Sequence, residues 1–202
     1  MATLYHARNT RSMRVLWVLE ELGAKAEIKS LPFPPSKHQP DYLAVNPTGT
    51  VPTLVDGFVR LTESMAICEY LATKHGSRLL VEPGDPARTE FVQWLWYGES
   101  TLMTPLSRMA TVGRLDRKGP DIDAVMEDAR GNVGVRLSAL ERRLEGRDFL
   151  VAGRLTLADI SVGYPLYLIG LTGLDRLLGP RSAAYRERLR SRPAYQKAVA
   201  VP

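Results

Sequence analysis

The chain has 202 residues, of which 45% are hydrophobic and 24% are charged, as in an ordinary globular protein. Its 27 Lys and Arg exceed its 22 Asp and Glu by five charges, but the two signs alternate without a long basic block, so we expect no nucleic-acid partner. No apolar run approaches the roughly 18 residues that a membrane helix needs, and the N-terminal residues carry no signal-peptide pattern. We therefore expect a cytoplasmic protein with no membrane partner.

The reactive side chains that commonly bind metals are few. A single cysteine, Cys68, excludes an internal disulfide and a thiolate-rich metal site, and we expect it to be buried and inert in a helix. The three histidines are far apart in the chain, so no metal is expected. We expect His6 and His75 to lie in a strand and at a helix end, respectively.

The first 77 residues alternate strand-like and helix-like patterns. Short strands are predicted at 3–6, 26–31, 51–55 and 58–61, and helices are predicted where Val15, Val18, Leu19 and Leu22 recur before Gly23 and over 63–75. Asp56-Gly57 is the strongest hairpin signal in the chain. The order β-α-β followed by β-β-α predicts a thioredoxin-like domain whose first two strands are parallel and whose last two are antiparallel.

The rest of the chain shows no strand pattern. Residues 78–86 contain Pro83-Gly84-Asp85-Pro86 and are expected to form a linker. Residues 87–202 are then expected to form an all-helical domain, with helices over 87–112, 122–144, 156–168 and 183–191. Residues 113–120 are polar and bounded by glycine, which indicates a mobile loop or a frayed helix end. The predicted fold class is therefore α/β plus all-α.

Two segments of the first domain carry candidate binding chemistry. Pro52 lies directly before a predicted strand, where it is either an ordinary trans proline or a cis residue that leaves the Val51 backbone groups free to pair with a peptide. Ser64 lies at the start of the helix over 63–75, where it either caps the helix or helps to hold a carboxylate at the positive end of the helix dipole. Glu63 beside it is suited to receive an ammonium group.

As a set, these motifs resemble the glutathione-binding half of the cytosolic glutathione S-transferases: Asn46-Pro47-x-Gly49-x-Val51-Pro52-x-Leu54 and then Glu63-Ser64-x-Ala66-Ile67-x-x-Tyr70-Leu71. The segment Leu155–Ile160 is similar to that family's helix-capping motif, with Thr156 and Asp159 as a capping box and Leu155 and Ile160 as a hydrophobic staple. The stretches over 11–22 and 94–103 resemble bacterial members of the serine or theta type.

The resemblance implies a glutathione S-transferase that uses glutathione as co-substrate, needs no metal and forms a homodimer. Its thiolate would attack an apolar electrophile, and reduction of organic peroxides is a second activity of such a site. Two alternatives stay open, namely a binding or regulatory protein that has lost catalysis and a glutathione-dependent isomerase. The absence of a cysteine before the first helix disfavours members that work through mixed disulfides.

A glutathione thiol with an ordinary pKa of about 8.5 needs a hydrogen-bond donor to become a thiolate at neutral pH. In theta-like relatives a serine four residues before the helix arginine donates to sulfur, and the same count from Arg14 reaches Thr10. Ser12 and then Asn9 are the next candidates. Tyr5, within the predicted strand, is the candidate for a tyrosine donor of the kind that other classes use.

The remaining site residues follow from the resemblance by position. Those expected to bind glutathione are Thr50, Val51, Pro52, Glu63 and Ser64, with Lys37, His38 or Gln39 reaching the glycyl carboxylate. The second substrate would lie between the domains, against a mixture of soft and apolar side chains suited to an electrophile with apolar bulk: Tyr97, Thr101, Met103, Leu106 and Met109.

Overall fold

The structure of the protein is a computed structural model that describes residues 1–115 and 117–202. The chain forms two compact units, which are described separately below. The first unit consists of Met1–Leu80 together with Arg190–Pro202, and the second is Val81–Leu189. Within the described residues, no helix combines the length and the apolar character that crossing a membrane requires.

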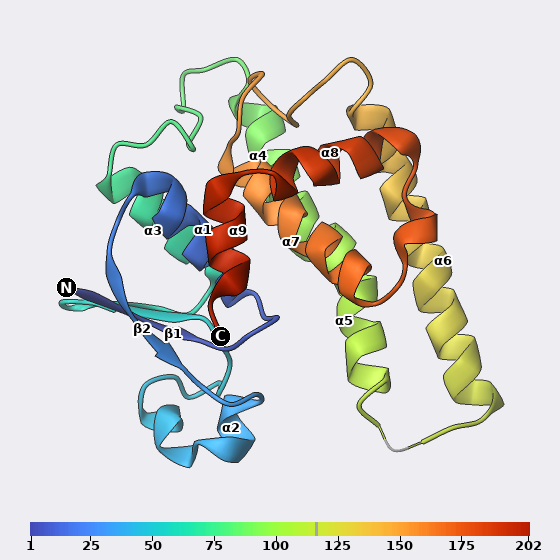
Figure 1. The fold of residues 1–202 in the computed structure, drawn as a ribbon, viewed down its shortest axis with the longest axis horizontal. Coiled ribbons are helices and arrows are strands. Elements are labelled where there is room, and N and C mark those ends of the chain that lie inside the picture. The colour runs from blue at the N-terminus through green and yellow to red at the C-terminus, as the bar shows by residue number, and fades with distance from the viewer. Residues whose placement is uncertain (116) are drawn as a thin grey trace. The chain divides into compact units, whose positions relative to one another are not determined.

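The first unit is built on a sheet with the strand order β2-β1-β3-β4, whose bounds are Ala26–Ser30, Ala2–His6, Thr53–Asp56 and Val59–Leu61 (Figure 1). Strands β1 and β2 are parallel, and β3 runs antiparallel to both β1 and β4. The turn between β3 and β4 contains Gly57 with a φ of 60°, as the Asp-Gly signal predicts. The expected thioredoxin-like order is therefore confirmed.

Helices α1 (Ser12–Leu22), α3 (Ser64–Lys74) and α9 (Pro193–Ala200) lie on one side of this sheet, and the short helix α2 (Pro35–His38) lies on the other (Figure 1). The first side holds the apolar core, where Leu4 of β1 and Leu54 of β3 are fully buried. Helix α2 and the 3-10 turn η1 (Pro40–Ala44) were not predicted, because residues 32–48 are rich in proline and polar side chains.

The C-terminal segment groups with the first unit, although we expected it in the helical domain. The Arg192 guanidinium donates to both carboxylate oxygens of Glu21 in α1, at 2.6 and 2.7 Å. The Trp17 and Tyr195 rings meet edge to face at 5.0 Å. Pro193 is the first residue of α9, where a missing N–H costs no helical hydrogen bond.

The second unit is helical, as expected. Its elements are α4 (Arg88–Trp96), the π-helical segment η2 (Tyr97–Leu102), α5 (Met103–Val112), α6 (Pro120–Arg143), α7 (Leu157–Leu171), η3 (Asp175–Leu177) and α8 (Pro180–Arg190). The single helix expected over 87–112 is therefore divided by a π-helical segment. Between α5 and α6, the loop expected over 113–120 includes Asp116, which lies outside the described residues.

The π-helical segment coincides with a very close approach to α7. A Cβ atom on Gly98 would lie 2.3 Å from the Oγ of Ser161, so only glycine fits at this position. The Ser161 hydroxyl in turn donates to the Leu95 carbonyl at 2.7 Å.

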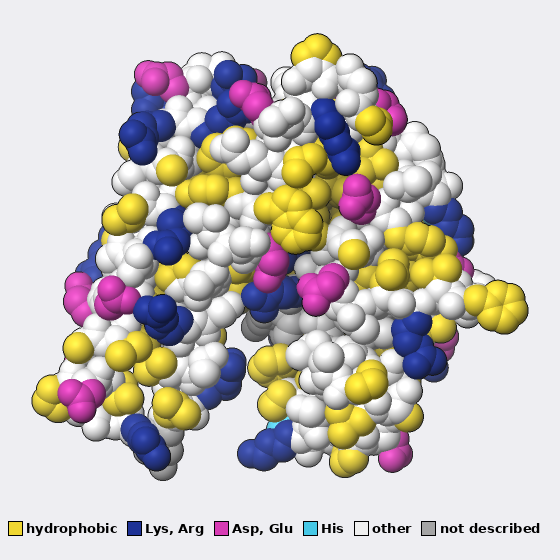
Figure 2. Space-filling view, turned by 180° about the vertical axis from the view of Figure 1, so that it is seen from behind, with side chains coloured by type: hydrophobic (Ala, Val, Ile, Leu, Met, Phe, Trp, Pro, Cys, Tyr) yellow, Lys and Arg dark blue, Asp and Glu magenta, His cyan; other side chains and the backbone are white. Residues whose placement is uncertain are grey.

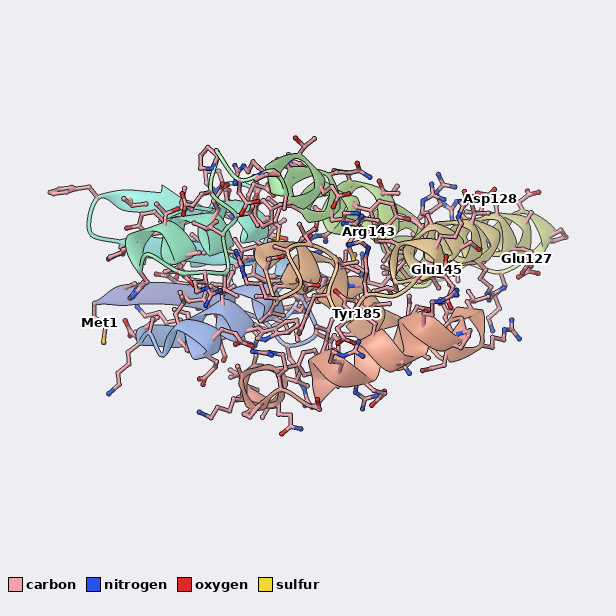
Figure 3. The ribbon with its side chains drawn as sticks, turned by 90° about the horizontal axis from the view of Figure 1, so that it is seen from above. Met1, Glu127, Asp128, Arg143, Glu145 and Tyr185 are labelled. Carbon is pink, nitrogen blue, oxygen red and sulfur yellow. The ribbon has the colours of Figure 1, made fainter. Side chains whose placement is uncertain are left out.

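The start of α7 confirms the predicted capping box. Thr156 is the N-cap, and its backbone N–H donates to the Asp159 carboxylate at 2.8 Å. Asp159 is fully buried and also accepts hydrogen bonds from the Leu150 N–H at 2.9 Å and from the Tyr185 hydroxyl of α8 at 2.8 Å. Tyr185 is labelled in Figure 3. Burial raises the pKa of Asp159, while these hydrogen bonds oppose the shift. The carboxylate thus ties the residues before α7 and helix α8 to the start of α7.

Figure 2 shows one face of the molecule, on which Lys and Arg are interspersed with Asp and Glu rather than gathered into one basic surface. This matches the alternation of charge along the sequence.

Candidate functional site

Two hydroxyl groups meet a histidine where β1 ends and α1 begins. The Ser12 Oγ lies 2.7 Å from His6 Nδ1 and 2.7 Å from Thr10 Oγ1. The Thr10 hydroxyl also donates to the Ala7 carbonyl at 2.6 Å, and Ser12 Oγ lies 3.2 Å from that oxygen. We call these four residues the hydroxyl cluster. It is formed because the chain turns sharply after β1 and brings position 12 back against positions 6 and 7.

The three catalytic candidates differ in how accessible they are. Ser12 is 0% exposed and Thr10 is 8% exposed, so Thr10 is the outer hydroxyl of the cluster. Asn9 is exposed and has a φ of 61°, in the left-handed region that asparagine tolerates better than most residues. A ligand approaching from solvent therefore meets Thr10 or Asn9 before Ser12.

Tyr5, the alternative donor, lies on the other face of the sheet. Side chains alternate along a strand, so Tyr5 points away from the side that holds Leu4 and His6. Its ring packs against the Tyr42 ring, with 5.3 Å between centroids. This placement separates the Tyr5 hydroxyl from the hydroxyl cluster.

The Val51–Pro52 peptide bond is cis, which excludes the ordinary trans proline, while pairing of the Val51 backbone with a peptide stays a prediction. Residues before it form a fixed loop, because the Thr50 carbonyl accepts hydrogen bonds from the Tyr42 hydroxyl and from Asn46 Nδ2, both at 2.8 Å. Val51 belongs to the same small apolar cluster as Tyr42 and Ala7. The cis bond is therefore held beside the backbone of the hydroxyl cluster.

Helix α2 lies directly against this loop. Gly49 has a φ of 64°, and a Cβ there would lie 2.4 Å from the Cβ of Ser36. The next three residues, Lys37, His38 and Gln39, are all exposed to solvent. The structure thus places these candidates beside the loop that carries Thr50, with side chains open to the exterior.

At the start of α3 the expected capping role is wrong for Ser64. The N-cap is Glu63, which is exposed, and Ser64 is the first helical residue. The Ser64 hydroxyl accepts a hydrogen bond from the Arg14 guanidinium of α1 at 3.2 Å, and both residues are buried. A buried positive charge therefore lies beneath the positive end of the α3 dipole, which favours an anion at this end of the helix.

In the sequence, Arg14 served only as the residue from which Thr10 was counted, and His6 was expected to be a strand residue rather than part of the site. The helix arginine could have been recognised as buried from its place within the apolar run of α1, between Met13 and Val15. His6 follows Leu4 at the two-residue spacing of a strand, which indicates a position on the core side. The hydrogen bond to Ser12 could not be read from the sequence.

Cys68 of α3 is fully buried, as expected. Burial raises the pKa of its thiol to about 12, with the Arg14 charge opposing the shift. This thiol is therefore protonated at neutral pH and is not a nucleophile.

The second-substrate candidates lie on η2 and α5 of the helical unit. The Tyr97 hydroxyl donates to the Arg136 carbonyl of α6 at 2.7 Å, and the Thr101 carbonyl accepts from Arg136 Nε at 3.0 Å. Burial raises the pKa of Tyr97, opposed by nearby arginine charges. The apolar candidates Met103, Leu106 and Met109 are buried.

The described ranges 1–115 and 117–202 contain no group of three or more His, Cys, Asp or Glu residues placed to hold a metal ion. The end of β1 and the start of α1 carry hydroxyl, imidazole and guanidinium groups, which can donate hydrogen bonds.

Both units resemble known protein families. Residues 1–73 match the family model of the glutathione S-transferase N-terminal domain, and residues 101–193 match that of the C-terminal domain. A curated relative from rice (Oryza sativa subsp. japonica), the probable glutathione S-transferase GSTF2, is 33% identical over 195 residues, which cover 93% of this chain and 90% of the relative.

Solved structures are similar over nearly the whole chain. A glutathione transferase family member from Pseudomonas fluorescens, with two glutathione bound, has a TM-score of 0.85 at 26% identity. The superposition covers 100% of this chain and 93% of the Pseudomonas chain. The glutathione transferase URE2P6 of Phanerochaete chrysosporium, in complex with oxidized glutathione, has a TM-score of 0.82 at 30% identity. The superposition covers 98% of this chain and 94% of the URE2P6 chain.

Proposed function

Because this chain belongs to the glutathione S-transferase family, we propose that it binds glutathione on its first unit and transfers the glutathionyl group to electrophilic substrates. The thiolate sulfur forms a bond to the electrophilic carbon, and the leaving group, such as chloride from a chlorinated aromatic, departs. The observation that carries the proposal is the hydroxyl cluster at the end of β1. It lies beside the cis Val51–Pro52 bond, and α1, which follows it, connects through Arg14 to the start of α3. These are groups that a thiol, a peptide backbone and a carboxylate need.

In this proposal the tripeptide pairs with the backbone of Val51, as an added strand would. Its γ-glutamyl carboxylate lies at the start of α3, where Ser64 and the buried Arg14 charge favour an anion, and its ammonium group faces Glu63. The glycyl carboxylate lies towards the exposed Lys37, His38 and Gln39. The Thr50 side chain borders the same backbone.

We assign the donor to sulfur to Thr10. It is the outer hydroxyl of the cluster, whereas Ser12 is fully buried and has contacts with His6, Thr10 and Ala7. A hydrogen bond to an anion stabilises it by roughly 1.5–3 kcal/mol, which lowers a thiol pKa by roughly one to two units. Lowering the pKa from about 8.5 to about 6.5–7.5 makes roughly a quarter to three quarters of bound glutathione thiolate at pH 7, with its proton released to solvent.

The test is to titrate the protein with reduced glutathione and follow thiolate absorbance near 240 nm as the pH is raised. We expect a thiol pKa below 7.5, together with conjugation of a chlorinated aromatic substrate. A Thr10→Val variant should retain binding and lose most of the thiolate. No binding at millimolar glutathione would contradict the proposal.

A second candidate is a binding protein without turnover. The observation that favours it is that the Thr10 hydroxyl already donates to the Ala7 carbonyl at 2.6 Å, so this hydrogen bond has to be exchanged before Thr10 reaches sulfur. Retention on glutathione resin combined with an unshifted thiol pKa would support this candidate over the enzyme.

We further propose that the chain is a bacterial-type member in which threonine takes the place of the serine of the theta type. The single buried thiol suits a reducing cytoplasm, where glutathione is available.

A homodimer is proposed from the family, and light scattering should then give twice the 22.5 kDa of one chain. Peroxidase activity is tested with cumene hydroperoxide and reduced glutathione.

A further inference from the structure

The hydroxyl cluster contains three contacts that are too short to lack a proton. They join His6 Nδ1 to Ser12 Oγ at 2.7 Å, Ser12 Oγ to Thr10 Oγ1 at 2.7 Å, and Thr10 Oγ1 to the Ala7 carbonyl at 2.6 Å. Two lone pairs repel at such distances, so each contact must contain one hydrogen. Three protons are therefore needed along this chain of four atoms.

The two hydroxyl groups supply one proton each, and the carbonyl supplies none. The third proton must come from Nδ1 of His6. If the ring carried its proton on Nε2 instead, Ser12 would donate to Nδ1, and Thr10 would have one proton for two short contacts. The proton count thus selects the Nδ1–H tautomer.

The other ring nitrogen, Nε2, is buried and makes no hydrogen bond within the part of the chain that the structure describes, so no short contact on that side requires the proton. Burial also lowers the pKa of His6, opposed in part by the backbone of Val201, so the ring carries a single proton at neutral pH.

We propose that His6 is a positioning residue whose Nδ1–H fixes the direction of the hydrogen-bond chain, from His6 to Ser12 to Thr10, so that Thr10 is the terminal donor. Because Ser12 donates to Thr10, the Thr10 proton points away from Ser12 and is exchanged from the Ala7 carbonyl to the glutathione sulfur. No covalent bond is made or broken within the cluster.

This inference rests on the proposed role of Thr10 but adds a residue that does not touch the substrate. In a chain of hydrogen bonds each donor polarises the next, so a hydroxyl that accepts from Ser12 is a stronger donor to sulfur. We expect loss of the His6 donor to lower the ionisation constant of the bound thiol by about three- to tenfold, and loss of the Thr10 hydroxyl to lower it by about ten- to a hundredfold.

The first experiment needs no change in the reacting groups. Long-range ¹H–¹⁵N spectra of histidine-labelled protein distinguish Nδ1–H from Nε2–H, and a His6→Asn variant identifies the His6 signals among the three histidines. We expect the Nδ1–H tautomer at pH 7.5. The Nε2–H tautomer would overturn the inference.

The second experiment compares His6→Asn with His6→Leu. An asparagine amide nitrogen can occupy the place of Nδ1 and donate to Ser12, whereas leucine fills the space without a donor. Thiolate absorbance of bound glutathione should give a thiol pKa within about 0.3 units of wild type for His6→Asn and 0.5–1 unit higher for His6→Leu. Circular dichroism and the glutathione dissociation constant check that both variants are folded and bind.

The outcomes separate the inference from the proposed function. If wild-type protein lowers the thiol pKa and Thr10→Val abolishes the effect, but His6→Leu folds, binds glutathione and leaves the pKa unchanged, only the role of His6 is wrong. If His6→Leu does not fold, the tautomer measurement on wild type still decides. If wild-type protein leaves the thiol pKa unchanged, the proposed activation itself fails.

Discussion

The Oγ1 of Thr10 and the Oγ of Ser12 lie 2.7 Å apart, yet removal of each hydroxyl group should affect a different property most. Thr10→Val replaces the hydroxyl by a methyl group of similar shape, and Ser12→Ala removes the inner hydroxyl. We expect Thr10→Val to affect the bound thiol more and Ser12→Ala to affect the stability of the fold more. The two variants are controls for each other, because they alter the same cluster.

The magnitudes follow from the contacts. Without the Ser12 oxygen, His6 Nδ1–H loses the acceptor 2.7 Å away, and the Ala7 N–H loses its contact at 3.4 Å, both in a buried setting. Unmet buried donors cost roughly 1–3 kcal/mol each, so the loss of two by Ser12→Ala should lower the free energy of unfolding by about 2–6 kcal/mol. Thr10→Val should lower it by about 1 kcal/mol, since Ser12 still reaches the Ala7 carbonyl at 3.2 Å.

For the pKa of bound glutathione, Thr10→Val should have the larger effect of the two variants. Thr10→Val removes the donor itself and should raise the pKa of bound glutathione by about one to two units, while Ser12→Ala removes only the hydrogen bond that supports the donor and should raise it by about 0.5–1 unit, as His6→Leu does. Urea unfolding followed by circular dichroism gives the first quantity, and thiolate absorbance gives the second. If Ser12→Ala raised the thiol pKa more than Thr10→Val, Ser12 would be the donor and the exposure argument would be refuted.

Three further predictions concern stability. Asp159→Asn should lower the free energy of unfolding by about 3 kcal/mol, because an amide cannot accept from all the buried donors around that carboxylate. The control Asp148→Asn, at an exposed ion pair, should change it by less than about 1 kcal/mol. Equal losses of stability in urea unfolding would contradict this. Glu21→Gln removes the ion pair with Arg192, so it should weaken the attachment of α9 to α1 and raise the rate of amide hydrogen exchange in α9. The control is Glu20→Gln, whose ion pair with Lys197 is more exposed. An unchanged exchange rate in Glu21→Gln would refute the attachment. Burial lowers the pKa of His6 below its ordinary value of 6.5, so below about pH 6.5 the unfolded chain binds a proton that the folded chain excludes. The free energy of unfolding should therefore fall as the pH drops below about 6.5. His6→Asn should remove this part of the pH dependence, and identical plots of unfolding free energy against pH for variant and wild type would contradict it.

Much of the fold could be predicted because local signals and long-range packing agree. Asp56-Gly57 forms the predicted hairpin, Gly23 ends α1, and Thr156 with Asp159 forms the predicted capping box. In each case the chemistry lies within a few neighbouring residues, so the sequence contains all of it.

The features that were not predicted depend on residues distant in sequence. The π-helical segment at Gly98 coincides with contact with Ser161, and the attachment of α9 involves Glu21, more than 170 positions from Arg192. Likewise, spacing alone indicated Thr10 and Ser12 but not which is accessible. That distinction follows from burial against His6, which a sequence pattern does not contain.

The return of the C-terminal segment to the first unit has a consequence for how the protein is made. Since Val81–Leu189 is one uninterrupted stretch, all of it is translated before the first unit is complete. The sheet has all its strands by residue 61, but α9 and Val201, which lie beside α1 and His6, are translated only after the helical unit. A chain truncated after Leu189 should therefore retain a protected helical unit, while proteases cut its N-terminal portion more readily.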